Sequence, residues 1–221
     1  MKTETSEVIH LIERFCKFLT CKIRKKMPDI NDERAEVIDY GLQLVIGEIP
    51  KTLIILLIAH ICGVLKLSII ALITIMPYRM FSGGVHLKTH IGCILATSFF
   101  YTGNAVISKI VVFNPIYIKY IAIILIWVFS IAMIKLYAPA DTEDVPILRE
   151  KERKLKKILS YITMTLTLIY SVLIGNPILS NIAILGVFIQ TIFISRLAYK
   201  LTHNKYGYEE YYKNKVIEKI A

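Results

Sequence analysis

Six apolar segments follow one another along the chain, and the short stretches between them hold most of the charged, proline and glycine residues. The segments cover about residues 41–65, 67–79, 92–112, 116–137, 156–174 and 178–198. Most are near the ~20 residues that a helix needs to cross the hydrocarbon core of a bilayer. The second is shorter, which suggests a tilted or re-entrant helix. The pattern therefore predicts an all-α integral membrane protein with about six hydrophobic helices.

The start of the chain, residues 1–34, has a different pattern because its apolar side chains recur at helical spacing. One helical face would hold Val8, Leu11, Ile12, Phe15, Phe18 and Leu19. The opposite face would hold Glu13, Lys17 and Lys22. We expect an N-terminal amphipathic helix that lies at the cytoplasmic interface of the membrane or packs on the rest of the protein. A membrane domain of residues 35–200 and a cytoplasmic tail of residues 201–221 would follow.

Composition supports this class, since 55% of the residues are hydrophobic and the mean hydropathy is +0.57. The net charge of +10 comes from basic clusters that flank apolar segments, so it does not indicate nucleic-acid binding. These clusters lie before residue 43, at about residues 138–157 and after residue 195. The positive-inside rule places all three on the cytoplasmic side. Six crossings, with a break near Lys66, satisfy that rule and leave residues 79–92 cytoplasmic.

The segment Arg79–Cys93, which reads RMFSGGVHLKTHIGC, holds two of the five histidines and a cysteine that opens the next apolar segment. A thiol near an imidazole can ionise, and the thiolate is the nucleophilic form. Cys93 is therefore a candidate nucleophile. The competing interpretation is a polar hairpin anchored to lipid headgroups. The four cysteines have no C-x-x-C spacing, so we expect neither a metal nor a disulfide framework.

Two histidines compete for the role of general base. In one straight helix His90 and Cys93 would be neighbours, whereas His86 would lie about 10 Å from Cys93 along the axis. Glycines at positions 83 and 84 permit a bend that could bring His86 back towards the thiol. Cys93 would then lie near the start of a helix, where the dipole favours a thiolate. Spacing alone leaves both histidines open.

The spacing R-x-x-x-x-G-x-H followed by six residues and a cysteine resembles the signature of the AgrB (accessory gene regulator B) family of membrane cysteine endopeptidases. Arg79, Gly84, His86 and Cys93 occupy its positions. Further similarity lies in Tyr40-Gly41 with Glu48 and Lys51, and in Tyr137-Ala138-Pro139-Ala140 with Pro146-Ile147. The agreement extends over roughly residues 35–200.

This resemblance implies that Cys93 and His86 form the catalytic pair, without a cofactor. Supporting positions would be Arg79, Gly83, Gly84 and Glu48. The implied reaction removes the C-terminal tail of an AgrD-type quorum-sensing propeptide through a Cys93 thioester and promotes thiolactone cyclisation of the autoinducing peptide. A basic group would bind the propeptide tail, namely Arg149, Lys151, Arg153 and Lys154. The protein would be a multi-pass homodimer of the bacterial cell membrane, in contact with its lipids.

Several alternatives stay open. Arg79 could bind a peptide carbonyl or stabilise oxyanion charge, or it could anchor the loop to headgroups. Glu48 could orient His86, although a local pair with Lys51 is the simpler account. A non-enzymatic transporter or peptide-export scaffold is the main alternative function, but the internal repeats and paired broken helices typical of transporters are not seen. A membrane acyltransferase that uses Cys93 would need a donor site that the sequence does not display.

Overall fold

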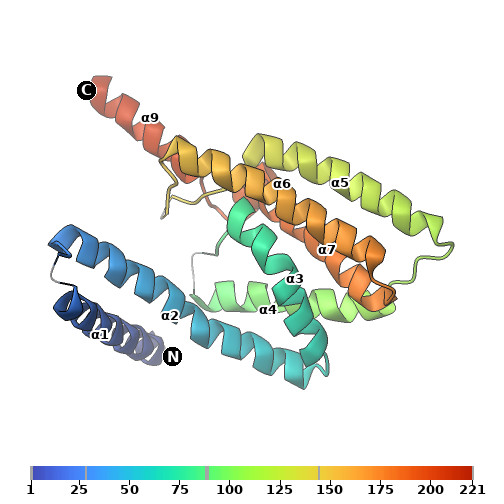
Figure 1. The fold of residues 1–221 in the computed structure, drawn as a ribbon, viewed down its shortest axis with the longest axis horizontal. Coiled ribbons are helices and arrows are strands. Elements are labelled where there is room, and N and C mark those ends of the chain that lie inside the picture. The colour runs from blue at the N-terminus through green and yellow to red at the C-terminus, as the bar shows by residue number, and fades with distance from the viewer. Residues whose placement is uncertain (1, 28, 88–89, 144, 221) are drawn as a thin grey trace. The chain divides into compact units, whose positions relative to one another are not determined.

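The computed structural model describes residues 2–27, 29–87, 90–143 and 145–220, with the side chains of residues 2–12, 44, 90–91 and 216–220 excepted. Within these ranges all regular structure is helical, apart from isolated bridges (Figure 1). The helices are α1 (Lys2–Lys26), α2 (Asp32–Ile61), α3 (Leu65–Ser82), α4 (His90–Ile110), α5 (Tyr117–Tyr137), α6 (Glu150–Leu173), α7 (Pro177–Phe193), α8 (Arg196–Leu201) and α9 (Gly207–Ile220). The all-α class expected from the sequence is confirmed.

Each apolar segment of the sequence forms one helix, from α2 to α7. Three of the described helices, α2, α3 and α5, are long and apolar enough to cross a membrane. Helix α7 is apolar but has 17 residues, and α6 begins with a run of charged residues, EKERKLKK. Helix α3 extends beyond the expected 67–79 at both ends, since it begins at Leu65 and ends at Ser82. The protein is thus a membrane protein, while six crossings stay a prediction.

The chain divides into two compact units, Met1–Ile55 and Leu56–Ala221. In the first unit α1 pairs with the beginning of α2. Thr20 Oγ1 donates to Asp39 Oδ1 at 3.3 Å, and the Arg24 guanidinium pairs with Asp32 at 2.5 Å. Cys16 is fully buried in this unit. A helix was expected here, and its position at a membrane interface stays a prediction.

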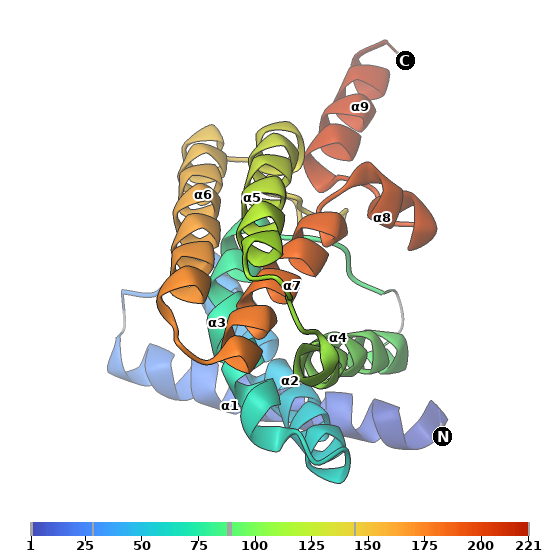
Figure 2. The same cartoon turned by 90° about the vertical axis from the view of Figure 1, so that its right-hand side faces the viewer.

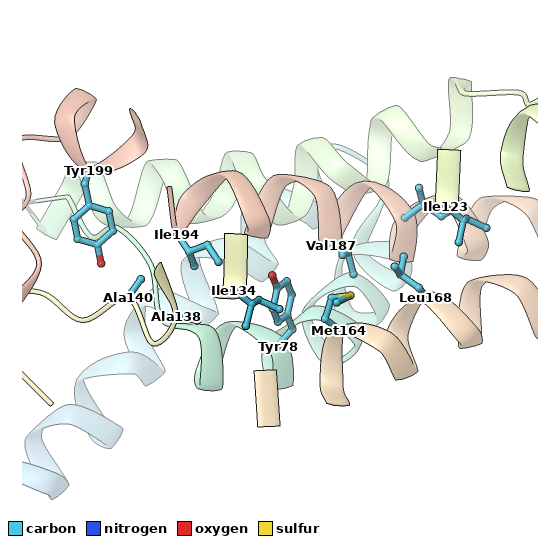
Figure 3. Close-up of a cluster of buried hydrophobic side chains, with 11 residues drawn as sticks. Tyr78, Ile123, Ile134, Ala138, Ala140, Met164, Leu168, Val187, Ile194 and Tyr199 are labelled. Carbon is cyan, nitrogen blue, oxygen red and sulfur yellow. The ribbon is translucent and has the colours of Figure 1, made fainter. Parts of the chain in front are cut away.

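In the second unit α7 is the central helix and packs against α3, α4, α5 and α6 (Figure 2). A helix that is apolar all round is either covered by other helices or spans a membrane, and α7 is covered on most of its surface. The described core is a cluster that runs along α7 and includes Tyr78, Ile134, Met164 and Val187, each fully buried (Figure 3). This cluster continues past the end of α7 to Ala140 and Tyr199, and so joins the helical core to the segment that follows α5.

Hydrogen bonds between side chains fix the position of α7 among its neighbours. Thr191 Oγ1 donates its one proton to the Val187 carbonyl at 2.7 Å. Its oxygen therefore acts as the acceptor for the hydroxyls of Tyr78, at 3.0 Å, and Ser130, at 2.8 Å. These contacts join α3, α5 and α7 within the core. Polar contacts of this kind fix helix register where apolar packing alone would allow sliding. The C-terminal turn of α7 is thereby held against the C-terminal turn of α3.

Candidate functional site

The chain turns sharply where α3 ends. Gly83 and Gly84 have φ values of 72° and 135°, which side chains disfavour. A Cβ atom on Gly83 would collide with the carbonyl oxygen of Ala140. Residues 83–87 are not helical, and α4 begins at His90. The bend expected at the two glycines is present, and the straight-helix alternative for residues 86–93 is excluded.

Two segments distant in sequence hold this loop by three backbone hydrogen bonds. Ala140 N–H donates to the Ser82 carbonyl at 2.8 Å, and Gly84 N–H donates to the Ala140 carbonyl at 2.9 Å. Val85 N–H donates to the Phe193 carbonyl at the end of α7, at 3.1 Å. These contacts use backbone groups, so they fix the path of the loop as long as positions 83 and 84 remain glycine.

A fourth contact reaches the histidine itself. The side-chain amide of Asn204, in the connection between α8 and α9, donates to the carbonyl oxygen of His86 at 2.6 Å. His203, next to Asn204, has a φ of 54°, in the left-handed region that non-glycine residues seldom adopt. The tail of the chain therefore forms part of the support of the loop.

Arg79 lies in the last turn of α3, and its side chain links this turn to α7 and to the loop. Its guanidinium donates to Gln190 Oε1 at 3.0 Å and to the Val85 carbonyl at 3.2 Å, and it lies 5.8 Å from the centre of the Phe193 ring. Gln190 is fully buried, and its amide donates to the Gly83 carbonyl at 2.8 Å and to Ser82 Oγ at 3.0 Å. One arginine and one glutamine thus connect α3, α7 and both ends of the Gly83–Val85 turn.

Cys93 and His86 lie on either side of the start of α4. Cys93 is in its first turn and is partly exposed, while the His86 side chain is exposed and belongs to the preceding loop. The imidazole of His90 lies outside the described side chains.

Glu48 lies in the other unit, on α2. Its carboxylate accepts a hydrogen bond from the Lys51 ammonium at 2.5 Å, one helical turn away. The local pair considered from the sequence is therefore present, and Glu48 is largely exposed.

The basic residues after α5 fall into two groups. Arg149, Lys151 and Lys154 are exposed. Arg153 instead pairs with the fully buried carboxylate of Asp141, with Nη1 to Oδ2 at 3.1 Å, and donates to the Pro139 carbonyl at 3.4 Å. Of the four residues expected to bind a propeptide tail, Arg153 is therefore engaged in an ion pair within the protein.

Asp141 organises the segment between α5 and α6. Besides Arg153, its Oδ2 atom accepts the N–H groups of Ile147 at 2.9 Å and Tyr208 at 3.0 Å. Its carbonyl accepts the Tyr199 hydroxyl at 3.0 Å, and burial raises the pKa of Tyr199, so this phenol remains a donor. Because Asp141 follows Ala140 directly, this network also fixes the backbone that holds the glycine turn.

Sequence reasoning missed Asp141, Gln190 and Asn204. Gln190 carried a usable signal, since a polar amide within an apolar segment must find partners inside the protein. Asp141 follows the Ala138-Pro139-Ala140 stretch that the family resemblance included without assigning it a role. Asn204 had no signal in the sequence that distinguishes it from other polar residues of the tail.

Comparison with known proteins identifies the family. The family model described as accessory gene regulator B matches residues 16–194. The chain belongs to the AgrB family. An AgrB-like protein of Listeria innocua serovar 6a is 30% identical over 207 residues, covering 92% of this chain and 96% of the relative. An AgrB-like protein of Clostridium acetobutylicum is 25% identical over 209 residues, covering 92% and 93%. No solved structure matches the chain.

AgrB membership places the chain in agr quorum sensing, where the family takes part in peptide processing, with an AgrD-type propeptide as its partner. All four residues of the family spacing quoted above, Arg79, Gly84, His86 and Cys93, lie within the matched region. Arg79 lies in the last turn of α3, Gly84 and His86 lie in the loop that follows, and Cys93 lies in the first turn of α4. Among the described residues no group of side chains is arranged to hold a metal ion.

Proposed function

We propose that the chain is a membrane-embedded cysteine endopeptidase that removes the C-terminal tail of an AgrD-type propeptide. The Cys93 thiol would give its proton to the His86 imidazole, and the thiolate would attack the scissile carbonyl carbon. Collapse of the tetrahedral intermediate would break the C–N bond, pass the imidazolium proton to the leaving amine and release the tail. A thioester between Cys93 and the retained part of the peptide would remain.

Ring closure would follow by exchange of one thioester for another. A cysteine thiolate within the bound peptide would attack the Cys93 thioester, so that the peptide becomes a thiolactone and Cys93 leaves as a thiolate. The exchange is close to isoenergetic, because one thioester replaces another. It therefore needs release of the tail and exclusion of water, and a loop at a membrane surface favours the latter.

The observation that carries this proposal is the placement of Cys93 in the first turn of α4, directly after a loop that contains His86 and whose backbone is fixed at Ser82, Gly84, Val85 and His86. Cleavage by general base and nucleophile needs both groups to be positioned before substrate arrives. We assign Arg79 and Gln190 to positioning of this loop rather than to substrate, since their polar groups already bind the loop. The pair Glu48 and Lys51 we assign to α2 alone.

For the fold in the membrane we propose six crossings, α2 to α7, with both termini and the catalytic loop on the cytoplasmic side. The exposed basic side chains at the start of α6 then face the cytoplasm, where Arg149 and Lys151, which lie outside the cavity described below, are available to an acidic propeptide tail. A homodimer in the bacterial cell membrane remains an expectation from the family.

The proposal is tested by co-expression with a propeptide from the same gene neighbourhood, with its two ends tagged and followed by immunoblot and mass spectrometry. The wild type should separate the tags, whereas Cys93→Ala and His86→Ala should not. Cys62→Ala, which changes an exposed cysteine in the α2–α3 turn, should retain cleavage. Cleavage by Cys93→Ala would refute the peptidase, and loss in His90→Ala with retention in His86→Ala would reassign the base.

A second experiment tests the thioester. A propeptide whose own cysteine is replaced by alanine lacks the thiol that resolves the intermediate. Tail release should then leave the remaining peptide on Cys93 as an adduct that hydroxylamine removes. Tail release with no adduct at any time would indicate direct hydrolysis. A transporter or export scaffold would leave both propeptides intact.

A further inference from the structure

A cavity of about 410 Å³, lined by polar and apolar surface in similar amounts, lies where the end of α5, the beginning of α6 and the beginning of α9 meet. On the α6 side it is lined by Glu150, Arg153, Lys154 and Lys157. These residues share one face, because Arg153 and Lys154 lie three and four residues after Glu150 and Lys157 lies one turn further on. Tyr206 and Tyr208 line it from the tail. The volume is within the range of small-ligand sites, which is about 300–1,000 Å³.

The charges that line this cavity favour an anion. Among the described residues no carboxylate lies within ion-pair distance of Lys154 or Lys157, and Lys157 donates to the Lys135 carbonyl at 2.6 Å. Two acidic residues also line the cavity, namely Glu150 at the start of α6 and Glu209, which is paired with Arg196 at 3.0 Å. The two lysines therefore bring positive charge to the cavity without carboxylate partners. An occupant with a compact negative group would pair with both.

The surface next to the cavity identifies the kind of occupant. Helix α6 carries an exposed apolar stripe at helical spacing, which consists of Leu155, Ile158, Ile162, Leu166, Ile169 and Leu173. The stripe begins beside the cavity, because Ile158 lies one turn after Lys154 on the same face. Leu136, which is 68% exposed, lines the cavity from the end of α5. A phosphate group and two apolar chains joined in one molecule would fit this arrangement.

We propose that this cavity binds the headgroup phosphate of an anionic phospholipid, with the acyl chains along the exposed faces of α5 and α6. Basic pockets beside membrane helices and tyrosines at the interface are the features by which such headgroups are held. A soluble anion would use the lysines but would leave the apolar stripe uncovered. The stripe is therefore the observation that favours a lipid.

The segments that line the cavity are continuous with the residues that hold the catalytic loop by hydrogen bonds. The inference that lipid binding affects cleavage rests on the proposed function. Ala138 and Pro139 line the cavity, and the next residue, Ala140, holds the glycine turn by two hydrogen bonds. On the other side Tyr206 lines the cavity, and Asn204, two residues earlier, holds the His86 carbonyl. A lipid bound between these walls would stabilise both supports, and we expect it to increase the rate of cleavage.

Binding is tested on the full-length Cys93→Ala protein, so that the result does not depend on catalysis. The protein in detergent is titrated with phosphatidylglycerol or phosphatidylcholine, and retained lipid is counted by native mass spectrometry. We expect preference for phosphatidylglycerol. The double variant Lys154→Gln with Lys157→Gln should weaken its binding by about tenfold or more. The matched control, Arg149→Gln with Lys151→Gln, changes the same charge outside the cavity and should bind within about twofold of the parent.

Further measurements keep the result interpretable. Circular dichroism and size-exclusion elution check that the variants fold, and Lys154→Glu, at one exposed position, is a second variant that should also lose binding. Equal loss in the two double variants, or equal binding of the two lipids, would overturn the site. Displacement of the lipid by inorganic phosphate or by a soluble acidic peptide at the same concentration would assign the cavity to a soluble anion.

The coupling has its own measurement. Wild-type cleavage should be faster in nanodiscs that contain phosphatidylglycerol than in phosphatidylcholine alone, and the difference should disappear in Lys154→Gln with Lys157→Gln. If the protein binds phosphatidylglycerol but cleaves at the same rate in both lipids, the coupling is refuted while the lipid site is retained. If the wild-type protein cleaved the propeptide in neither lipid, the proposed function would be contradicted, while the binding titration would still stand.

Discussion

Gly83 and Ala140 form a parallel bridge between the turn after α3 and the segment after α5. The contact is so close that the Ala140 carbonyl oxygen lies 2.2 Å from the position that a Cβ atom on Gly83 would take. Both residues belong to stretches that the family resemblance picked out separately. Their contact gives one physical reason for both, since the bend of the loop requires a residue without a side chain and a partner backbone in a fixed place.

Gly83→Ala should therefore displace the loop that carries His86. The added methyl group would meet the Ala140 carbonyl, and φ of 72° would be strained for alanine. A displacement of about 1 Å in a catalytic group can lower the rate about 100-fold, and we expect a loss of that size in propeptide cleavage. The measurement is the initial rate of tail release by purified protein in nanodiscs.

The matched control is Gly103→Ala in α4, the helix that begins beside Cys93. Open space surrounds a Cβ atom at this position, and alanine favours a helix over glycine by roughly 1 kcal/mol. Cleavage by this variant should stay within about twofold of wild type. Wild-type activity in Gly83→Ala would show that the path of the loop does not limit catalysis.

The variant Arg79→Lys distinguishes two roles of Arg79, namely holding the loop by hydrogen bonds and supplying a positive charge. Lysine keeps the positive charge but cannot bridge Gln190 and the Val85 carbonyl with a planar fork, as Arg79 does at 3.0 and 3.2 Å. We expect cleavage to fall about tenfold or more, with the loss in kcat rather than in KM. Arg196→Lys, at an exposed pair with Glu209, is the control and should be neutral. Full activity of Arg79→Lys would favour headgroup anchoring.

The sequence predicted the helices well because each apolar segment is long and bounded by proline, glycine or charge. It also predicted the bend at Gly83 and Gly84, since two adjacent glycines before a helix have few other uses. It underestimated the length of α3, which runs from Leu65 to Ser82 rather than over residues 67–79, because a basic residue such as Lys66 can belong to a membrane helix when its long side chain extends to the interface.

What the sequence could not predict is which residues support the loop. Periodicity indicates which face of a helix is buried but not which helix covers it, so the contact of Gln190 with Gly83, 107 positions away, has no local signature. The same holds for Asn204 and the His86 carbonyl, 118 positions apart. Arg153 was expected to bind substrate with its neighbours, because charge alone does not reveal that Asp141 is buried beside it.

Asp141→Ala should destabilise the second unit strongly. It would leave the Arg153 guanidinium and the N–H groups of Ile147 and Tyr208 without their acceptor. Loss of one partner from a buried ion pair typically costs about 3–5 kcal/mol. Unfolding in mixed micelles with increasing sodium dodecyl sulfate, followed by circular dichroism, measures the change.

Glu152→Gln is the control for this experiment, because it removes an exposed pair with Lys156 at 3.0 Å on the same helix as Arg153. Its effect should be about 0.5 kcal/mol or less. A loss in Asp141→Ala no larger than that of the control would mean that the ion pair contributes little. In that case Asp141 would not be what fixes the Ala140 backbone.

The native cysteines allow a direct test of the proposed crossings. With six spans and a cytoplasmic N-terminus, the turn between α2 and α3 faces outward, so Cys62 lies outside and Cys21, on α1, lies inside. Both are exposed in the structure, whereas Cys16 is buried and should not react. In cells that express the Cys93→Ala protein, a membrane-impermeant maleimide should label Cys62 alone, and Cys21 should react only after permeabilisation. Mass spectrometry of the labelled peptides identifies each site, and Cys62→Ser should abolish labelling of intact cells. Labelling of Cys21 in intact cells would reverse the orientation and place the loop of His86 and Cys93 outside, away from a newly made propeptide.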